Sequence, residues 1–247
     1  MVNIEDIAAK ILRERPIVSE QRSLLVGISG IDGSGKGYVA KQIEARLDQH
    51  SIAAANINVD GWLNLPDRRF SLIKPAENFY ENAIRFDELF TQLLLPLKHH
   101  RSVSVTANFT TETASDFRKE VYRFENVGVV LVEGIFLFKR EYRNLFDVAI
   151  WVDCSFPTAL ARALARAQEG LPPVETIHAY ETTYFPAQKI HFARDNPRET
   201  ADLIIDNESE VTRGLQSGID EIARLALNRR SFFDVPAAQS LPTRPRH

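Results

Sequence analysis

The stretch "VGISGIDGSGKGYVAK" (residues 26–41) decides the fold. It opens as an apolar run and continues into a segment whose apolar residues recur at helical spacing. At the junction, Gly30, Gly35 and Lys36 fit the pattern G-x-x-x-x-G-K. Glycines in such a loop let backbone N–H groups turn toward a phosphate, and the helix N-terminus adds its dipole. The stretch therefore predicts a strand, a phosphate-binding loop and a helix, in that order.

We expect this loop to bind the phosphates of a nucleotide. The residues assigned to this role are Gly30, Asp32, Gly33, Ser34, Gly35, Lys36, Gly37 and Tyr38. Lys36 would reach the β- and γ-phosphates as a point charge. A glycine-rich turn with a surface lysine is the alternative, but it does not explain why the pattern lies between a strand and a helix.

Gly37 departs from the usual pattern, which has Ser or Thr at this position. The missing hydroxyl normally coordinates Mg²⁺ beside the β-phosphate. Because Mg²⁺ keeps several waters in most phosphate sites, one more water could fill that position. We expect phosphate binding by the backbone to survive, while metal affinity and turnover are the properties at risk.

Five apolar, β-branched stretches recur along the chain, with helical patterns between them. They are residues 23–29, 53–59, 127–133, 147–153 and 201–207. Their hydrophobicity is continuous, which is typical of parallel strands covered on both faces. Strands that alternate with helices predict a doubly wound α/β domain. Residues 102–109 alternate instead, and predict an edge strand or part of a small insertion.

The 247 residues suffice for one large α/β domain or two small ones. We assign residues 1–227 to a single domain. Within it, residues 1–21 are an appended amphipathic helix, and apolar spacing predicts further helices at 39–47, 86–94 and 211–226. The tail, 228–247, has no periodicity and is assigned as a C-terminal extension.

Composition and charge limit the classes of partner. Hydrophobic residues make up 44% of the chain and charged residues 26%, without an apolar run long enough to span a bilayer. A net charge of -3 gives no basic footprint for nucleic acid. The N-terminus lacks the pattern of a signal peptide, and Cys154 is the only cysteine. We therefore expect a cytoplasmic protein without nucleic-acid or membrane partners.

Acidic residues end two of the predicted strands. Asp60 follows "NINV" and Glu133 follows "VVLV", and ligands of such sheets bind beyond the carboxyl ends of the strands. Phosphoryl transfer from ATP needs Mg²⁺ to be held and an acceptor hydroxyl to be deprotonated. Asp60 suits the general base and Glu133 a Mg²⁺ contact, and both are candidate metal ligands. One acid alone could simply cap the next turn, but two after a phosphate-binding loop favour catalysis.

A basic helical face follows the fourth predicted strand. Arg162 and Arg166 lie four residues apart in "PTALARALAR" (157–166), and "EGLPP" (169–173) then ends the helix. The pattern suits a lid that brings cations to the transferred phosphate, although a solvated basic face fits the spacing equally well. The candidate catalytic residues are thus Lys36, Asp60, Glu133, Arg162 and Arg166.

Taken in this order, the segments resemble the uridine kinase/phosphoribulokinase group of P-loop kinases over about residues 22–208. The resemblance is carried by "GISGIDGSGKG" (27–37), Asp60, "VVLVEGIFLF" (129–138), "LFDVAIWVD" (145–153), "LARALAR" (160–166) and "YETTYFPAQKIHFARDNPRETADLIIDN" (180–207). The phosphate loop is common to many NTPases. The "EGI" strand end and the Tyr-x-x-x-x-x-Pro-Ala stretch are more particular to this group.

The resemblance implies a five-stranded parallel sheet and a helical lid at about 157–192. It implies transfer of the γ-phosphate of ATP to a hydroxyl of a small molecule, with Asp60 as the base and both lid arginines taking part. Whether the chain forms a homo-oligomer stays open.

The acceptor pocket is where the chain departs from uridine kinases. These have Asn-Phe-Asp, whose acid holds the ribose, where this chain has Asn78, Phe79 and Tyr80, and a glutamine that helps to hold the nucleoside falls on Ala179. The residues assigned here to the acceptor are Asp60, Trp62, Arg68, Arg69, Tyr80 and Tyr180. If the two arginines face the site, the acceptor is anionic, such as a sugar phosphate or an acid; if they face solvent, they say nothing about it.

Two functions follow from these residues. The leading one is an ATP-dependent kinase of a nucleoside or another small hydroxyl compound. The alternative is a catalytically weak nucleotide-binding regulatory protein, which Gly37 and the altered acceptor residues suggest. The presence of Lys36, Asp60 and Glu133 favours the enzyme, since a pure binder needs no base.

Overall fold

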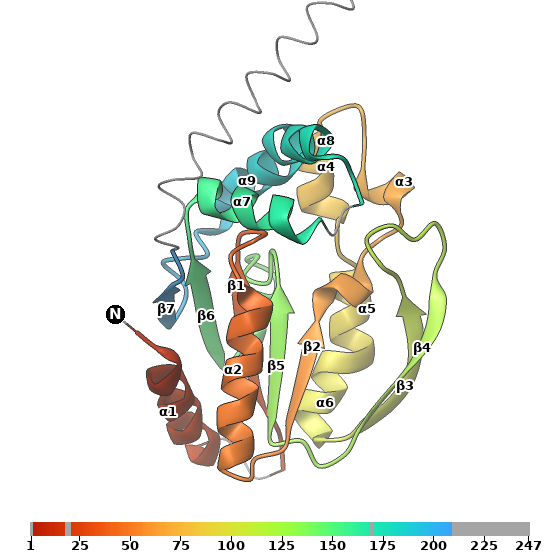
Figure 1. Cartoon of the computed structure of the whole chain (residues 1–247). Coiled ribbons are helices and arrows are strands. Elements are labelled where there is room, and N and C mark those ends of the chain that lie inside the picture. Colours follow the sequence, from red (N-terminus) through yellow and green to blue (C-terminus); the bar gives the residue numbers. More distant parts are fainter. Residues whose placement is uncertain (1, 18–20, 168–169, 209–247) are drawn as a thin grey trace, which may run out of the picture.

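A five-stranded parallel sheet forms the centre of the computed structural model (Figure 1), which describes residues 2–17, 21–167 and 170–208. Its strands are β1 (Leu24–Gly30), β2 (Ala54–Asn58), β5 (Val129–Gly134), β6 (Val148–Asp153) and β7 (Leu203–Asp206). They lie in the order β2-β5-β1-β6-β7 and all pair in parallel. The five strands predicted from the sequence and the α/β class are confirmed.

The sheet is covered on both faces, which explains the continuous hydrophobicity of its strands. In β5, Val129 and Leu131 face one core, which α1 (Ile4–Glu14) and α2 (Lys36–Gln49) cover. Val130 and Val132, offset by one residue, face the other and larger core. Successive side chains of a strand point to opposite faces, so the residues of β5 from Val129 to Val132 are all apolar.

The remaining helices cover the second face and the carboxyl edge of the sheet. They are α3 (Pro66–Arg69), α4 (Pro75–Asn82), α5 (Phe86–Leu89), α6 (Leu95–His100), α7 (Phe156–Arg166), α8 (Pro173–Ala179) and α9 (Phe185–Asp195). One π-helical turn, Phe90–Leu94, joins α5 to α6, and another, Tyr180–Tyr184, joins α8 to α9. Short 3₁₀ turns lie at Arg15–Ile17, Val59–Trp62 and Arg143–Leu145.

The alternating stretch at 102–109 is one strand of a hairpin that stands apart from the main sheet. Strands β3 (Val103–Phe109) and β4 (Arg118–Phe124) pair antiparallel and form a two-stranded sheet of their own. The ring of Trp62 stacks on Tyr122 of this hairpin with 5.5 Å between ring centroids. The insertion is therefore anchored to the turn that follows β2.

The helices predicted at 39–47 and 86–94 lie within α2 and within the α5–α6 segment. The appended N-terminal helix corresponds to α1, whose Asn3 and Asp6 form a reciprocal N-terminal cap at 3.0 Å. The helix predicted at 211–226 and the extension at 228–247 lie outside the described residues. No helix within the described ranges is both long and apolar enough to cross a membrane.

Candidate active site

The loop between β1 and α2 wraps around the N-terminus of a fourteen-residue helix. Gly33 and Gly35 have φ values of 77° and 92°, the left-handed region that glycine adopts without steric cost. The ammonium of Lys36 is buried and donates to the backbone oxygen of Ile31 at 2.9 Å. The loop thus closes on itself and aims its backbone N–H groups and one ammonium at a common space.

Asp32 ties this loop to the lid helices. Its carboxylate accepts a hydrogen bond from the hydroxyl of Tyr180 and pairs with Arg166 at 3.4 Å. Burial alone raises the pKa of Asp32, but the charges of Lys36 and Arg166 and the Tyr180 hydroxyl outweigh it and hold this pKa below its ordinary value. Asp32 is therefore ionised in the folded protein.

Two carboxylates face the loop from the neighbouring strands, because β2 and β5 pair with Asn58 opposite Glu133. Within the described ranges the carboxylate of Glu133 forms no hydrogen bond or ion pair, whereas the side chain of Asn58 favours the ionised form of Asp60 through a hydrogen bond. Burial raises the pKa of Glu133 to about 7, against the opposing charge of Lys36. Burial, followed by the charge of Asp32, also raises the pKa of Asp60. The charge of Lys36 opposes the rise of both pKa values without cancelling it.

A divalent cation fits this arrangement. Carboxylate oxygens are the ligands that Mg²⁺ prefers, and Asp60 and Glu133 open into one cavity. Within the described ranges, no three His, Cys, Asp or Glu side chains are grouped to hold a metal ion by themselves. A cation here would therefore need phosphate oxygens and water to complete its shell.

The arginines of α7 lie on the other side of the loop. Arg162 donates to the backbone oxygens of Gly33 and Ser34 at 3.4 and 3.3 Å and to that of Asn207 at 2.8 Å. Arg166 reaches Asp32 and is partly exposed. In this conformation Arg162 braces the loop, while Arg166 stands at its mouth.

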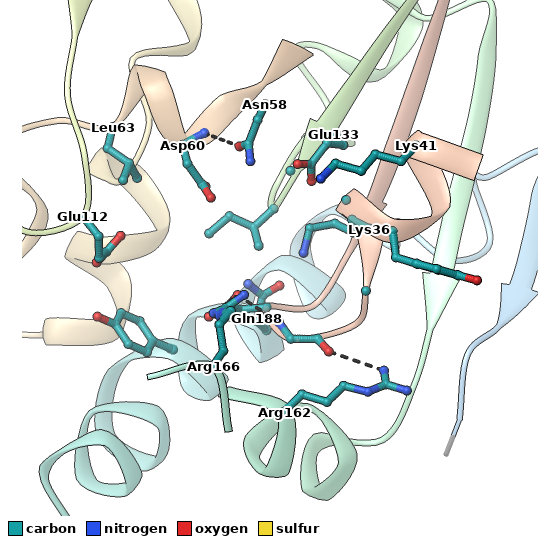
Figure 2. A pocket seen from close by; sticks show the side chains of 18 of the residues that line it. Lys36, Lys41, Asn58, Asp60, Leu63, Glu112, Glu133, Arg162, Arg166 and Gln188 are labelled. Carbon is teal, nitrogen blue, oxygen red and sulfur yellow. Dashed lines mark hydrogen bonds and ion pairs between the residues drawn. The ribbon is translucent and has the colours of Figure 1, made fainter. Parts of the chain in front are cut away.

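All these groups line one cavity of about 540 Å³ (Figure 2). Its walls are Asp32, Gly33, Gly35, Lys36, Gly37, Tyr38, Lys41, Asn58, Asp60, Leu63, Phe79, Glu112, Glu133, Gly134, Ile135, Arg162, Arg166, Tyr184 and Gln188. The cations lie on the loop and lid side. On the opposite side, Leu63 approaches from the end of the turn after β2, Phe79 from α4 and Glu112 from the hairpin connection.

Comparison with known proteins identifies the family. Residues 25–170 match the model of the phosphoribulokinase/uridine kinase family. The chain belongs to this family. It is 31% identical, over 186 residues, to a uridine kinase from Staphylococcus haemolyticus, with 73% of this chain and 86% of that protein aligned.

Solved structures show the same fold. A "possible uridine kinase" from Bacillus stearothermophilus aligns with a TM-score of 0.65 at 20% identity, over 82% of this chain and 97% of that one. A D-glycerate 3-kinase from Cryptococcus neoformans aligns with a TM-score of 0.52 at 13% identity, over 75% and 87%. The chain is a P-loop kinase of the family, and relatives with this fold carry names that refer to different acceptors.

Within this P-loop kinase, the five residues predicted for catalysis all line the cavity. They are Lys36, Asp60, Glu133, Arg162 and Arg166. Of the predicted nucleotide-binding residues, Gly30 and Ser34 lie behind the cavity wall, and a Cβ added to Gly30 would come within 2.6 Å of the Ser34 hydroxyl. Their role in the geometry is to let the loop pack against itself.

Most of the residues assigned to the acceptor lie outside the cavity. Trp62 is fully buried between Tyr122 and the guanidinium of Arg85. Arg68 is exposed, and Arg69 is fully buried with its guanidinium on the Glu112 carboxylate at 2.9 Å. An anionic acceptor was expected only if the guanidinium groups of Arg68 and Arg69 face the acceptor site. Neither residue lines the cavity.

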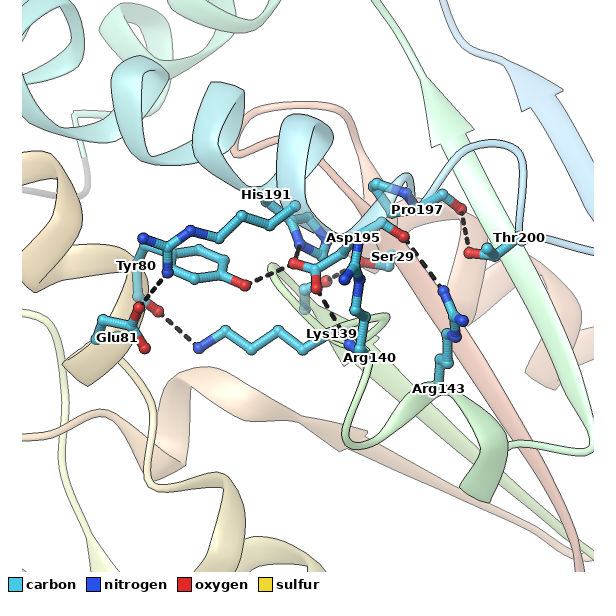
Figure 3. A network of polar contacts seen from close by, with 12 residues as sticks. Ser29, Tyr80, Glu81, Lys139, Arg140, Arg143, His191, Asp195, Pro197 and Thr200 are labelled. Atoms are coloured by element: carbon cyan, nitrogen blue, oxygen red, sulfur yellow. Dashed lines mark hydrogen bonds and ion pairs between the residues drawn. The ribbon is translucent and has the colours of Figure 1, made fainter.

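Tyr80 also points away from the cavity, into a buried polar network (Figure 3). Its hydroxyl donates to Asp195 at 2.6 Å, and Asp195 also contacts the Nδ1 atom of His191 at 2.7 Å. Lys139 donates to the backbone oxygen of Tyr80 at 2.7 Å and lies over its ring. Tyr80 and Tyr180 therefore fix the positions of α4 and the loop, and Phe79 is the residue of α4 that reaches the cavity.

Five cavity residues with polar groups escaped the sequence analysis, namely Lys41, Asn58, Glu112, Tyr184 and Gln188. Glu112 lies in the connection between β3 and β4, whose second strand was not predicted. Gln188 is 1% exposed, and neither of its amide atoms has a hydrogen-bond partner. The spacing of Tyr184 and Gln188 could have predicted that Gln188 is buried. The two residues are four apart, on the helical face that also buries His191.

Proposed function

We propose that this kinase transfers the γ-phosphate of ATP to a hydroxyl group of a small, uncharged molecule. The observation that carries the proposal is the position of Asp60. Its carboxylate opens into the same cavity as Lys36 and Glu133 and forms no ion pair within the described ranges. A base with a raised pKa, next to a phosphate-binding ammonium, is the arrangement that phosphoryl transfer to a hydroxyl requires.

The chain's own groups account for each proton and bond. Backbone N–H groups of the loop and Lys36 bind the β- and γ-phosphates. Asp60 accepts the proton of the acceptor hydroxyl as its oxygen attacks the γ-phosphorus. A new oxygen–phosphorus bond forms, the bond to the β,γ-bridging oxygen breaks, and ADP leaves with the electron pair. Arg166, at the mouth of the loop, stabilises the charge on the transferred group.

Mg²⁺ is the cofactor that the carboxylates fit. Glu133 and Asp60 would hold it, directly or through water, together with phosphate oxygens. When bound, it would neutralise charge on the phosphates and orient them. Because Gly37 provides no hydroxyl, these two carboxylates are the only protein ligands that we assign to it.

The acceptor side of the cavity supports an uncharged acceptor. Glu112 contributes a carboxylate and Gln188 an unpaired amide, while Leu63, Phe79 and Tyr184 contribute apolar or ring surface. Carboxylate and amide oxygens accept hydrogen bonds from hydroxyl groups, so these side chains suit an uncharged hydroxyl compound. The ion pair between Arg69 and Glu112 cancels both charges, so Arg69 adds no net positive charge that would favour an anionic acceptor.

The experiment compares Asp60→Asn, Glu133→Gln and Asp67→Asn, the last as an exposed carboxylate control on α3. ATP affinity is measured by calorimetry, and ADP release is measured with nucleosides, sugars, sugar phosphates and hydroxy acids. We expect Asp60→Asn to lower acceptor-dependent turnover by about 10²–10⁴-fold with little change in ATP affinity. Glu133→Gln should lose both turnover and the response to Mg²⁺, and Asp67→Asn should retain both.

The same data test the alternative of a nucleotide-binding regulator. Binding of ATP without ADP release for any acceptor would support the regulator. Full turnover in Asp60→Asn would remove the proposed base.

A further inference from the structure

Gly37 is the second residue of α2, and its backbone does not require glycine. Among the described glycines, only Gly33, Gly35 and Gly170 have positive φ values. A Cβ added to Gly37 would lie 3.3 Å from Oε1 of Glu133, closer than most such contacts. The absence of a side chain therefore leaves open the space between the start of α2 and Glu133.

Lys41 lies one helical turn after Gly37, on the same face of α2. Helical side chains lean toward the N-terminus, so the surface that a residue covers lies over the preceding turn. The side chain of Lys41 accordingly lines the cavity together with Gly37 and Glu133, and Figure 2 shows it beside the Glu133 carboxylate. Lys41 and the open space at Gly37 therefore adjoin the same carboxylate, that of Glu133.

The ammonium of Lys41 has no structural partner among the described residues. It forms no hydrogen bond or ion pair with any residue in the described ranges, and it is exposed to the cavity. Its charge acts on Glu133, where it opposes the effect of burial on the pKa. A long, uncommitted ammonium at the N-terminus of a phosphate-binding helix is suited to an anion.

We propose that Lys41 is a second phosphate-binding ammonium of this cavity, which makes nucleotide binding less dependent on Mg²⁺. The inference rests on the nucleotide site proposed above and adds a residue to it. The hydroxyl that is usual at position 37 coordinates Mg²⁺, whereas an ammonium contacts phosphate oxygens directly. The ammonium of Lys41 would then compensate for the metal-coordinating hydroxyl that Gly37 lacks.

The test measures ATP affinity by calorimetry in EDTA and again in excess Mg²⁺, so that its readout does not depend on turnover. Lys41→Ala should weaken metal-free ATP binding by about 10- to 100-fold, as expected for loss of a hydrogen bond from a charged group. It should weaken binding less when Mg²⁺ is present. Lys41→Arg should retain metal-free binding, and Lys10→Ala on α1 controls for net charge.

Gly37→Ser, alone and combined with Lys41→Ala, tests whether the two positions act together. Gly37→Ser places a side chain against Glu133, and we expect it to weaken metal-free binding while making Mg²⁺ more beneficial. In the double variant Gly37→Ser, Lys41→Ala, ATP affinity should be much higher in excess Mg²⁺ than in EDTA. Circular dichroism and thermal unfolding show whether each variant is folded.

The outcomes separate the two proposals. Equal metal-free affinity of Lys41→Ala and the parent protein would overturn the role of Lys41 and leave the kinase proposal intact. Absence of ATP binding by the parent protein under both conditions would overturn both.

Discussion

The hydroxyl of Tyr80 donates a 2.6 Å hydrogen bond to Asp195, and these residues are 115 positions apart in the chain. The bond joins α4 to the end of α9, and both helices also contribute a wall of the cavity through Phe79 and Gln188. Tyr80 thus aligns the acceptor side of the cavity without being part of it.

Tyr80→Phe should lower the free energy of unfolding by about 1–2 kcal/mol, because it removes a buried hydrogen bond to a carboxylate. The KM for the acceptor should change less than threefold. Urea denaturation and steady-state kinetics measure the two effects. A large rise in KM with unchanged stability would instead place the hydroxyl on the acceptor.

Gln188→Leu should have opposite effects on stability and on acceptor binding. Both amide atoms are buried without partners, so an apolar side chain of similar size should raise the free energy of unfolding by about 1 kcal/mol or more. The KM for the acceptor should rise at least about tenfold if the amide binds it. Thermal unfolding and kinetics check this, with the exposed Gln92→Leu as the control. A loss of stability would show that the amide already has a partner.

Glu133 should make the nucleotide-free protein less stable as the pH rises. Its pKa is about 7 in the folded protein and 4.5 at its ordinary value, so the folded state binds the proton more tightly. Stability therefore falls between about pH 4.5 and pH 7. At about 1.4 kcal/mol per pH unit, the loss is at most about 3.5 kcal/mol.

Glu133→Gln should abolish this loss, so that the variant is more stable than the parent protein at pH 8 and similar to it at pH 4.5. Urea denaturation across this range is the measurement, and the exposed Glu125→Gln should follow the parent protein. Parallel curves for the parent protein and Glu133→Gln would contradict the raised pKa.

Lys36→Ala should weaken ATP binding at least about tenfold, since the variant loses a charge-assisted hydrogen bond to phosphate. Calorimetry in the presence of Mg²⁺ is the measurement, with Lys10→Ala as the control. Unchanged affinity would mean that the loop binds phosphate through its backbone alone.

The central sheet could be predicted from the sequence because its signals are local. Each strand is a short apolar run covered on both faces, and the glycines of the loop lie directly between β1 and α2. The carboxylates of Asp60 and Glu133 could be placed for the same reason, since each ends a recognisable strand and β2 pairs with β5.

The acceptor side could not be predicted, because its contacts join distant segments. Arg69 pairs with Glu112, 43 residues away, so its charge is neutralised by a residue in a hairpin of which only one strand gave a signal. The sequence shows that Trp62 and Tyr80 are large and amphipathic, but not which way they turn. Tertiary packing decides that Trp62 holds the hairpin and that Tyr80 faces Asp195.

The separation of the hairpin from the main sheet has a consequence for how such a kinase can evolve. Glu112 lies on a connection whose strands share no ladder with the strand ends that carry Asp60 and Glu133. Substitutions in the connection can therefore change what the cavity accepts while the phosphate chemistry stays intact. A mutant library confined to residues 110–117 would sample new acceptors, and wherever Glu112 is changed the buried Arg69 would need a replacement partner.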